Sequence, residues 1–231
     1  MVGIIEIKEI FSRVFQIKFE DGRIAIATET LVPGLKVYDE KIVQHDDREY
    51  RIWNPYRSKL AAAILNGIKE LPIKPGSRVL YLGIASGTTA SHISDIIGEN
   101  GIIYGIEFAH RPFRDLIKVA ENRKNIVPLL KDARLPESFS YIGENVDILY
   151  ADLAQPNQAQ IFLHNAEIFL KENGYGLIAI KARSIDVTKP PDEIFEEQRE
   201  ILEAGGMRIL KGIKLDPYAK DHIMFLLRYQ Y

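Results

Sequence analysis

Beyond residue 54 the chain alternates between short apolar runs and stretches whose apolar residues recur every three or four positions. The apolar run 79–82 predicts a strand buried on both faces, and the pattern from residue 88 predicts a helix through residue 97. A second buried strand is predicted at 102–106. Regular alternation of strands and helices is typical of a mostly parallel sheet with helices on both faces.

The same two periodicities predict the other elements of this region. Helices are predicted at 56–69, 111–123, 158–170 and 192–203, and strands at 126–130, 146–150, 176–182, 207–213 and 222–229. The connection 214–221 is too short for a parallel crossover, so we expect the last two strands to pair antiparallel. The expected fold is a seven-stranded, mostly parallel sheet with an antiparallel last strand.

Residues 1–53 follow a different pattern. Apolar and polar residues alternate at 15–19, and an Asp-Gly turn leads into the apolar run 24–27, which predicts a β-hairpin. Further short strands are predicted at 37–38, 42–43 and 49–53. We therefore expect a small antiparallel β domain at 1–53 and a larger α/β domain at 54–231.

Two aromatic residues stand where the expected domains join. Tyr50 and Trp53 fit either an anchor for a partner protein or the seam between the two domains, and we favour the seam.

Composition narrows the functions that this chain can have. Thirty basic and 32 acidic residues among 231 give a formal charge of −2, which argues against a chain that captures polyanions by itself. The chain has no cysteine, so a disulfide framework, a thiolate nucleophile and a zinc–thiolate site are excluded, and we expect no metal. No signal peptide and no membrane span are recognisable, so we expect the cytoplasm as the compartment.

The loop after the first strand of the sheet carries the clearest chemistry. Gly83, Ala85 and Gly87 predict a tight turn, where small residues let backbone N–H groups approach a ligand. Glu107 ends the next strand, twenty residues beyond Gly87, where a carboxylate can accept hydrogen bonds from a ribose diol. Strand, turn, helix, strand and terminal acid predict a nucleoside-binding βαβ unit.

The spacing of the small residues indicates which nucleoside is bound. A dinucleotide fingerprint would need glycine at positions 83, 85 and 88, but the chain has Ala85 and Thr88. The spacing Gly83-x-Ala85-x-Gly87 instead resembles the first motif of S-adenosylmethionine-dependent methyltransferases. Tyr81 stands where many of those enzymes carry an acid.

Further candidates follow the other strands, because ligands bind beyond the carboxyl ends of the strands in such sheets. Asp132 can accept a hydrogen bond from an adenine amino group, and Phe108 can cover the ring; alternatively Asp132 caps a loop and Phe108 is core. Asp152 and Lys181 end adjacent strands that lie about 5 Å apart, close enough for an ion pair. Such a pair is either functional, which we favour, or a structural salt bridge.

Four longer strings resemble the fibrillarin family, and the chain length resembles its archaeal form. They are NPYRSKLAAA at 54–63, YLGIASGTTASH at 81–92, ADLAQPNQ at 151–158 and YAKDH at 218–222. The resemblance covers nearly the whole chain. It implies an RNA-guided ribose 2′-O-methyltransferase that acts on pre-rRNA and tRNA as the catalytic subunit of box C/D ribonucleoproteins.

The resemblance also implies a cofactor, partners and site residues. The cofactor would be S-adenosylmethionine; the partners would be a Nop-family scaffold protein, a kink-turn-binding ribosomal-protein relative, a guide RNA and the target RNA. The implied catalytic residues are Lys59, Asp152, Lys181 and His222. The cofactor-binding residues so predicted are Gly83, Ala85, Gly87, Thr88, Thr89, Glu107, Phe108, Asp132, Ala133, Asp152, Leu153, Ala154 and Gln155.

A ribose hydroxyl is a weak nucleophile, so catalysis must align it and stabilise the developing alkoxide. Lys181 can supply positive charge or, if Lys59 depresses its pKa, take the proton; both roles stay open. Lys59 and His222 would position the target nucleotide. The alternatives are a catalytically silent scaffold with this fold, or a small-molecule or DNA methyltransferase. The latter should carry an Asn/Asp-Pro-Pro-aromatic motif where this chain has Asp152-Leu-Ala-Gln.

Overall fold

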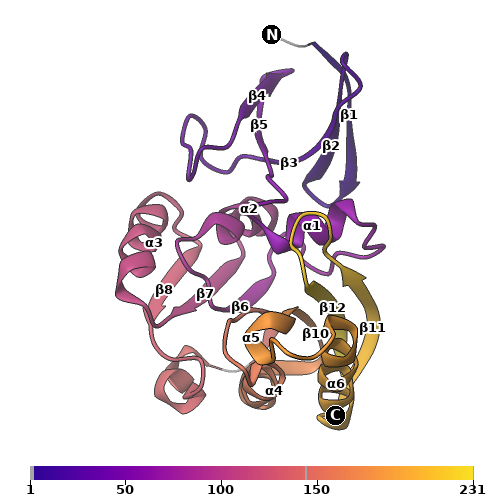
Figure 1. The fold of residues 1–231 in the computed structure, drawn as a ribbon. Helices are drawn as coiled ribbons and strands as arrows, with labels where there is room; N and C mark the ends of the chain where they lie inside the picture. Colours follow the sequence, from indigo (N-terminus) through magenta and orange to yellow (C-terminus); the bar gives the residue numbers. More distant parts are fainter. Residues whose placement is uncertain (1–2, 144, 231) are drawn as a thin grey trace.

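A computed structural model describes residues 3–143 and 145–230, and it contains two separate β-sheets (Figure 1). The N-terminal sheet is antiparallel, with the strand order β1-β2-β3-β5-β4. Its strands are β1 (Ile4–Phe11), β2 (Val14–Phe19), β3 (Ile24–Glu29), β4 (Ile42–His45) and β5 (Arg48–Ile52).

The N-terminal sheet differs from the sequence prediction in two places. Strand β1 was not predicted, and the strand predicted at 37–38 is wrong. The backbone N–H groups of Val37 and Tyr38 donate to the carboxylate of Glu40, at 2.9 and 2.8 Å, instead of to a neighbouring strand. This side chain satisfies the loop backbone, so the segment needs no strand partner.

The second sheet has the strand order β11-β12-β10-β9-β6-β7-β8. Its strands are β6 (Arg78–Leu82), β7 (Ile102–Glu107), β8 (Ile126–Leu130), β9 (Val146–Asp152), β10 (Leu170–Lys181), β11 (Met207–Lys214) and β12 (His222–Tyr229). Strands β6 to β10 pair in parallel, whereas β12 lies between β10 and β11 and is antiparallel to both. The predicted seven-stranded sheet with an antiparallel last strand is confirmed.

Helices cover both faces of the second sheet (Figure 1). They are α1 (Lys59–Leu65), α2 (Thr88–Ile97), α3 (His110–Asn122), α4 (Gln158–Phe169), α5 (Ala182–Ile185) and α6 (Pro191–Ala204), with the 3-10 segment η1 (Pro136–Ile142). Alternate residues of β6 separate the two cores: Val79 and Tyr81 pack with α1 and α2, and Leu80 and Leu82 pack with α4 and α6.

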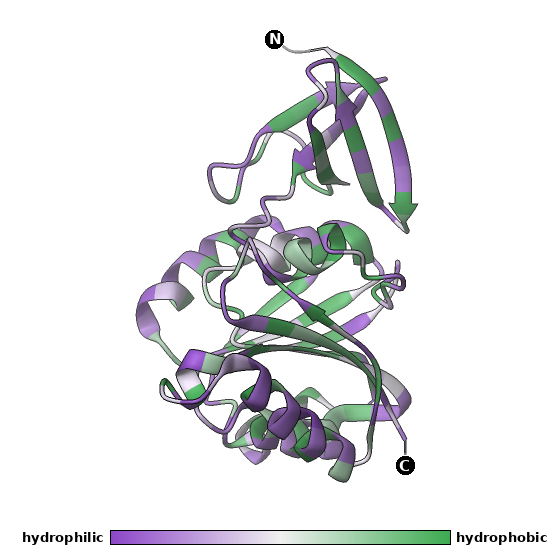
Figure 2. Cartoon of the chain, turned by 45° about the vertical axis from the view of Figure 1, so that its right-hand side comes forward, coloured by the Kyte–Doolittle hydropathy of each residue, from purple (hydrophilic) through white to green (hydrophobic). Residues whose placement is uncertain are grey.

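Helix α1 is shorter than predicted because both of its ends are fixed. Ser58 caps the N-terminus by accepting a hydrogen bond from the Ala61 N–H at 3.4 Å, and Gly67 has a φ of +89° just beyond the C-terminus. Colouring by hydropathy shows apolar strands in the middle layer and polar residues on the outer helix faces (Figure 2). Within 3–143 and 145–230, no helix has the length and apolar character needed to cross a membrane.

Buried polar side chains join the N-terminal sheet to α2. Arg51 donates to Glu40 at 2.7 Å and to Asp95 at 2.7 Å, and Asp95 also accepts from Arg123 at 2.5 Å. His92 hydrogen-bonds Tyr38 and Thr28, and its ring stacks on Trp53 with centroids 4.7 Å apart. We call Thr28, Tyr38, Glu40, Arg51, His92, Asp95 and Arg123 the interface network.

The structure shows where the two aromatic residues expected at the seam lie. Trp53 lies there, fully buried, as expected. Tyr50 instead packs edge-on against Phe15 inside the N-terminal sheet, at 5.1 Å. Because α2 begins at the loop that follows β6, the network fixes the helix that carries this loop.

Candidate functional site

The loop after β6 has a backbone that requires small residues. Gly83 has a φ of +75°, and a Cβ there would lie 2.4 Å from the backbone oxygen of Asp152. Gly87 has a φ of +89°, and Ala85 also adopts a positive φ of 52°. The close approach of Gly83 to Asp152 brings the carboxyl ends of β6 and β9 together.

A cavity of about 460 Å³ opens at these strand ends. Its lining includes nine of the predicted cofactor residues: Gly83, Ala85, Glu107, Phe108, Ala133, Asp152, Leu153, Ala154 and Gln155. Ile106, Lys131 and Pro156 complete the lining. The expectation that a ligand binds beyond the carboxyl ends of the strands therefore coincides with a cavity. Most of the predicted cofactor residues line this one cavity.

Glu107 lines this cavity, and two backbone N–H groups hold its carboxylate. One carboxylate oxygen accepts from the Ala85 N–H at 3.0 Å and the other from the Ala109 N–H at 2.7 Å. The side chain is buried, yet within the described ranges each oxygen accepts one hydrogen bond and keeps a second lone pair for a further donor. Glu107 thus fixes the turn after β6 and lines the cavity with a carboxylate.

Two further candidates, Phe108 and Asp132, differ in whether they line the cavity. Phe108 borders the cavity with 60% of its surface exposed, so it is not a core residue. Asp132 does not line the cavity; Arg134 binds its carboxylate, with a nearest distance of 2.5 Å. These hydrogen bonds from the Arg134 side chain lower the pKa of Asp132. A contact of Asp132 with an adenine amino group stays a prediction and would have to share the carboxylate with Arg134.

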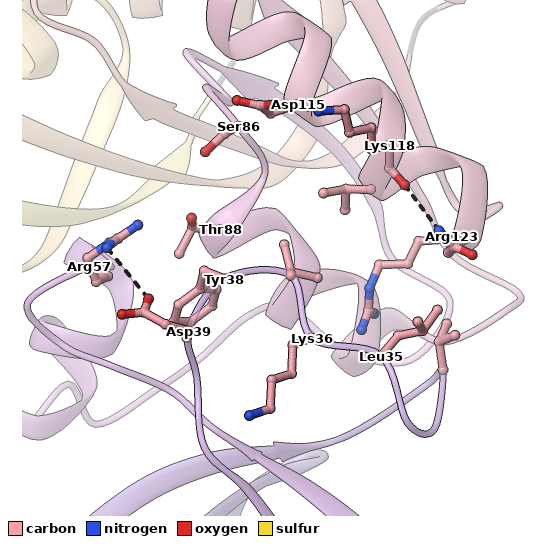
Figure 3. Close-up of a pocket in the computed structure, with 14 residues that line it drawn as sticks. Leu35, Lys36, Tyr38, Asp39, Arg57, Ser86, Thr88, Asp115, Lys118 and Arg123 are labelled. Atoms are coloured by element: carbon pink, nitrogen blue, oxygen red, sulfur yellow. Dashed lines mark hydrogen bonds and ion pairs between the residues drawn. The ribbon is translucent and has the colours of Figure 1, made fainter.

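The two threonines at the start of α2 lie outside the cavity lining. The Thr89 hydroxyl donates to Ser58 at 2.9 Å, which ties α2 to the start of α1. Thr88 and Ser86 border a second cavity of about 500 Å³, together with Arg57 and Lys118 (Figure 3). In this view Arg57 points toward Asp39, at 3.7 Å. The loop after β6 therefore separates two cavities.

Asp152 connects the cavity to the predicted catalytic residues. Both of its carboxylate oxygens contact the Lys59 ammonium, at 2.6 and 2.7 Å, and each side chain keeps about a quarter of its surface exposed. Lys59 is the first residue of α1, so Ser58 and the helix start place its amine over the end of β9.

The expected ion pair between Asp152 and Lys181 is not what the structure contains. In the parallel register Asp152 lies opposite Ala179, so Lys181 is two residues, roughly 7 Å, further along β10. Within the described ranges the Lys181 ammonium has no carboxylate within 4.0 Å. The expected pairing is therefore wrong: the lysine that binds Asp152 is Lys59, not Lys181.

His222 lies beside this cluster at the start of β12, directly opposite Lys181 in the antiparallel register. Its Nδ1 is 2.6 Å from the backbone carbonyl of Lys220, so Nδ1 carries the proton, and among the described residues Nε2 has no hydrogen-bond partner. Burial lowers the pKa of His222, and the charges of Lys59 and Lys181 lower it further against the effect of the Lys220 carbonyl. We call Lys59, Asp152, Lys181 and His222 the tetrad; the structure brings all four together.

Sequence reasoning missed two residues that hold the tetrad in place. Gln158 is fully buried and brackets Lys181: it accepts from the Lys181 N–H at 3.0 Å and donates to the Lys181 carbonyl at 3.3 Å. Ser58 caps α1 and binds Thr89. A serine before an apolar helix is a recognisable N-cap signal, so Ser58 could have been predicted. No local sequence pattern indicates that Gln158 supports the end of a strand.

A family model described as fibrillarin matches residues 5–231. The chain belongs to the fibrillarin family. A relative from Methanocaldococcus jannaschii, named fibrillarin-like rRNA/tRNA 2'-O-methyltransferase, is 55% identical over 222 residues, which are 96% of each chain.

Solved fibrillarin structures match the fold over almost the whole chain. Aeropyrum pernix fibrillarin, in complex with natively bound S-adenosyl-L-methionine, is 52% identical with a TM-score of 0.91 and covers 98% of this chain and 100% of its own. A fibrillarin/Nop5p complex contains a chain that is 43% identical with a TM-score of 0.86, covering 97% and 100%. Fibrillarin membership therefore includes both sheets.

Proposed function

We propose that this fibrillarin transfers a methyl group from S-adenosylmethionine to ribose 2′-hydroxyls of rRNA and tRNA. One observation carries the proposal: Asp152 lines the cofactor cavity and at the same time binds Lys59 of the tetrad. A single carboxylate thus joins a nucleoside-sized cavity to a cluster of two lysines and a histidine, and the close relatives are named for the same reaction.

The residues that line the cavity offer the groups that S-adenosylmethionine needs. Buried Glu107 offers acceptor lone pairs for a ribose diol, and exposed Phe108 offers a face for an adenine ring. The Gly83 loop lets the ligand approach the backbone closely. When bound, the cofactor supplies a methyl group on a sulfonium, which is already a good electrophile, so the protein's task is to prepare the hydroxyl.

We assign roles within the tetrad from its contacts. The pKa of His222 is lowered, and its Nε2 has no partner among the described residues, which makes Nε2 a candidate acceptor for the hydroxyl proton. Lys181, without a carboxylate at ion-pair distance within the described ranges, can direct its charge toward the developing alkoxide. Lys59 is engaged by Asp152 and orients that carboxylate beside the cavity.

The RNA must be brought to this site by other molecules, because a chain with a formal charge of −2 lacks the positive excess of an autonomous RNA binder. A solved fibrillarin chain forms a complex with Nop5p, so a Nop-family scaffold is the first proposed partner. We further propose a box C/D guide RNA and a kink-turn-binding ribosomal-protein relative, assembled in the cytoplasm without a membrane.

Ribose mapping tests this function. The chain alone, and the chain with guide RNA and both proteins, are incubated with target RNA and labelled cofactor, and methylated riboses are located by mass spectrometry. We expect guide-dependent transfer to one 2′-hydroxyl only in the assembled particle. Efficient site-specific transfer by the chain alone would contradict the need for guidance. An assembled, cofactor-bound particle that transfers nothing would favour a silent scaffold.

A further inference from the structure

Two tyrosines form an edge-to-face pair between the chain segments that precede Lys59 and His222. The rings of Tyr56 and Tyr218 have centroids 5.1 Å apart and an interplanar angle of 74°. Tyr56 precedes Lys59 by three residues, and Tyr218 precedes His222 by four. The pair therefore connects the two segments that deliver Lys59 and His222 to the site.

The backbone under both rings is fixed. The Tyr56 N–H donates to the Asn54 side chain at 2.9 Å, and the Tyr218 N–H donates to the Leu215 carbonyl at 2.9 Å. Asn66, at the end of α1, donates to the carbonyls of Lys214 and Asp216, both at 2.8 Å. These bonds hold the β11–β12 connection against α1, where Figure 1 draws the yellow loop across that helix. The two rings therefore sit on a rigid base.

The pair presents one ring to solvent. Tyr56 is 68% exposed, whereas Tyr218 is partly buried against the core and supports Tyr56 from the side. Arg57, the next residue in the chain, lies over the Tyr38 ring, 5.8 Å from its centroid, and among the described residues its ion pair is with the exposed Asp39 at 3.7 Å, so its charge is weakly neutralised. A rigid, exposed aromatic ring next to a cation is the combination that binds nucleotides through stacking and phosphate attraction.

We propose that Tyr56, supported by Tyr218, packs against the sugar and base of a nucleotide next to the methylated one and so aligns the target ribose with the tetrad. Tyr56 is a positioning residue in this account, because it acts through the RNA strand and not on the reacting hydroxyl. The inference rests on the proposed function, since RNA is the substrate that must pass this point. A ring face, rather than the phenol hydroxyl, is what the contact requires.

The test uses the assembled particle with guide and target RNA. Y56A, Y56F and Y218A are compared with Y141A, whose ring is equally exposed at 67% but lies on η1. We expect Y56A to lower kcat/KM for target RNA roughly tenfold, the usual effect of removing one stacking ring. Y56F should stay close to the intact protein because it keeps the ring, Y218A should be intermediate, and Y141A should match the intact protein. Cofactor Kd and Tm should not change in any variant.

Four outcomes are distinguished. Loss in Y56A with retention in Y56F supports the platform. Equal rates for Y56A and Y141A, or equal losses for Y56A and Y56F, would overturn it. If the particle with the intact chain methylates no ribose, the proposed function fails, and that result is separate from any difference among the tyrosine variants.

Discussion

The chain holds two buried or half-buried polar assemblies, each with one histidine whose pKa is lowered by burial. Around His92 every ring nitrogen has a partner: Nδ1–H donates to Thr28 at 2.8 Å, Thr28 donates to Asp95 at 2.8 Å, and Tyr38 donates to Nε2 at 2.7 Å. Around His222 Nδ1 is hydrogen-bonded, whereas Nε2 has no partner in the part of the chain that the structure describes. The side chains of the interface network bond to one another, which we call closed. The tetrad keeps an acceptor nitrogen for a substrate, which we call open.

The same contrast appears in the ion pairs. Arg51 and Asp95 are fully buried, and Asp95 serves two arginines at once. Lys59 and Asp152 are both about a quarter exposed, and Lys181 nearby has no such pair within the described ranges. Buried charges that lose a partner destabilise a protein strongly, whereas half-exposed charges can be kept available for chemistry. Removing a member of the first group should therefore change stability, and removing a member of the second should change rate.

The largest effect is expected from Asp95→Ala, which leaves the buried guanidinium groups of Arg51 and Arg123 short of a counter-charge. We expect a loss of about 3–5 kcal/mol in the free energy of unfolding, measured by urea denaturation. Asp192→Ala, which removes an exposed pair with Lys214, is the matched control and should change little. A loss in Asp95→Ala no larger than in this control would show that the interface network does not stabilise the fold.

The next effect concerns the tetrad. Asp152→Ala and Lys181→Ala should each lower the single-turnover methylation rate about 10²- to 10³-fold while the free energy of unfolding stays near its original value. A variant that combines two tetrad substitutions should be hardly slower than the slower of its two single variants. The energetic coupling should be greatest between Lys59 and Asp152, which are in contact. Additive losses would mean that the four side chains act independently.

Glu107 lies between the two extremes, since it is buried like the interface network but faces a ligand cavity. Glu107→Ala should weaken S-adenosylmethionine binding by roughly 1.5–3 kcal/mol, because a ribose diol loses a charged acceptor. Isothermal titration calorimetry measures this. Glu107→Gln keeps the shape and should lose less; unchanged affinity in both variants would remove Glu107 from the site.

The free Nε2 of His222 gives the rate a particular pH dependence. Because burial lowers the pKa of His222, its ring is mostly neutral at pH 6.5 and above, so single-turnover methylation should change little from pH 8 to about 6.5 and fall at lower pH as the ring gains a proton. His222→Ala should be slow at every pH in this range. A rate that instead rises steadily into the alkaline range would assign the proton to a lysine such as Lys181.

The smallest effect should appear in the stability of the interface network. Burial, followed by the charges of Arg51 and Arg123, lowers the pKa of His92 well below its usual value. Below pH 6.5 the unfolded chain binds a proton that folded His92 does not, so stability should fall by up to about 1.4 kcal/mol per pH unit. His92→Gln removes this titration, and an unchanged slope in that variant would show that His92 is not its source.

The sequence predicts the open site better than the closed network. Gly83, Glu107 and Asp152 were recognisable because each follows an apolar strand, and strand ends converge in this fold. Arg51, Glu40 and Asp95 were not, because they lie far apart in the sequence and resemble ordinary surface charges until the two sheets are brought together. Pairing inside the site also escaped prediction, since the register of β9 against β10 decides which lysine reaches Asp152.

The position of β12 between β10 and β11 sets an expectation for how the sheet is completed during translation. The ribosome produces Lys59, Asp152 and Lys181 well before His222, so a nascent chain can fold its parallel strands while β10 and β11 still lack the strand that separates them. Insertion of β12 closes this gap and delivers His222 opposite Lys181 in the same step. A chain released before residue 222 should therefore have most of the sheet but an incomplete tetrad, together with unpaired strand edges that favour aggregation.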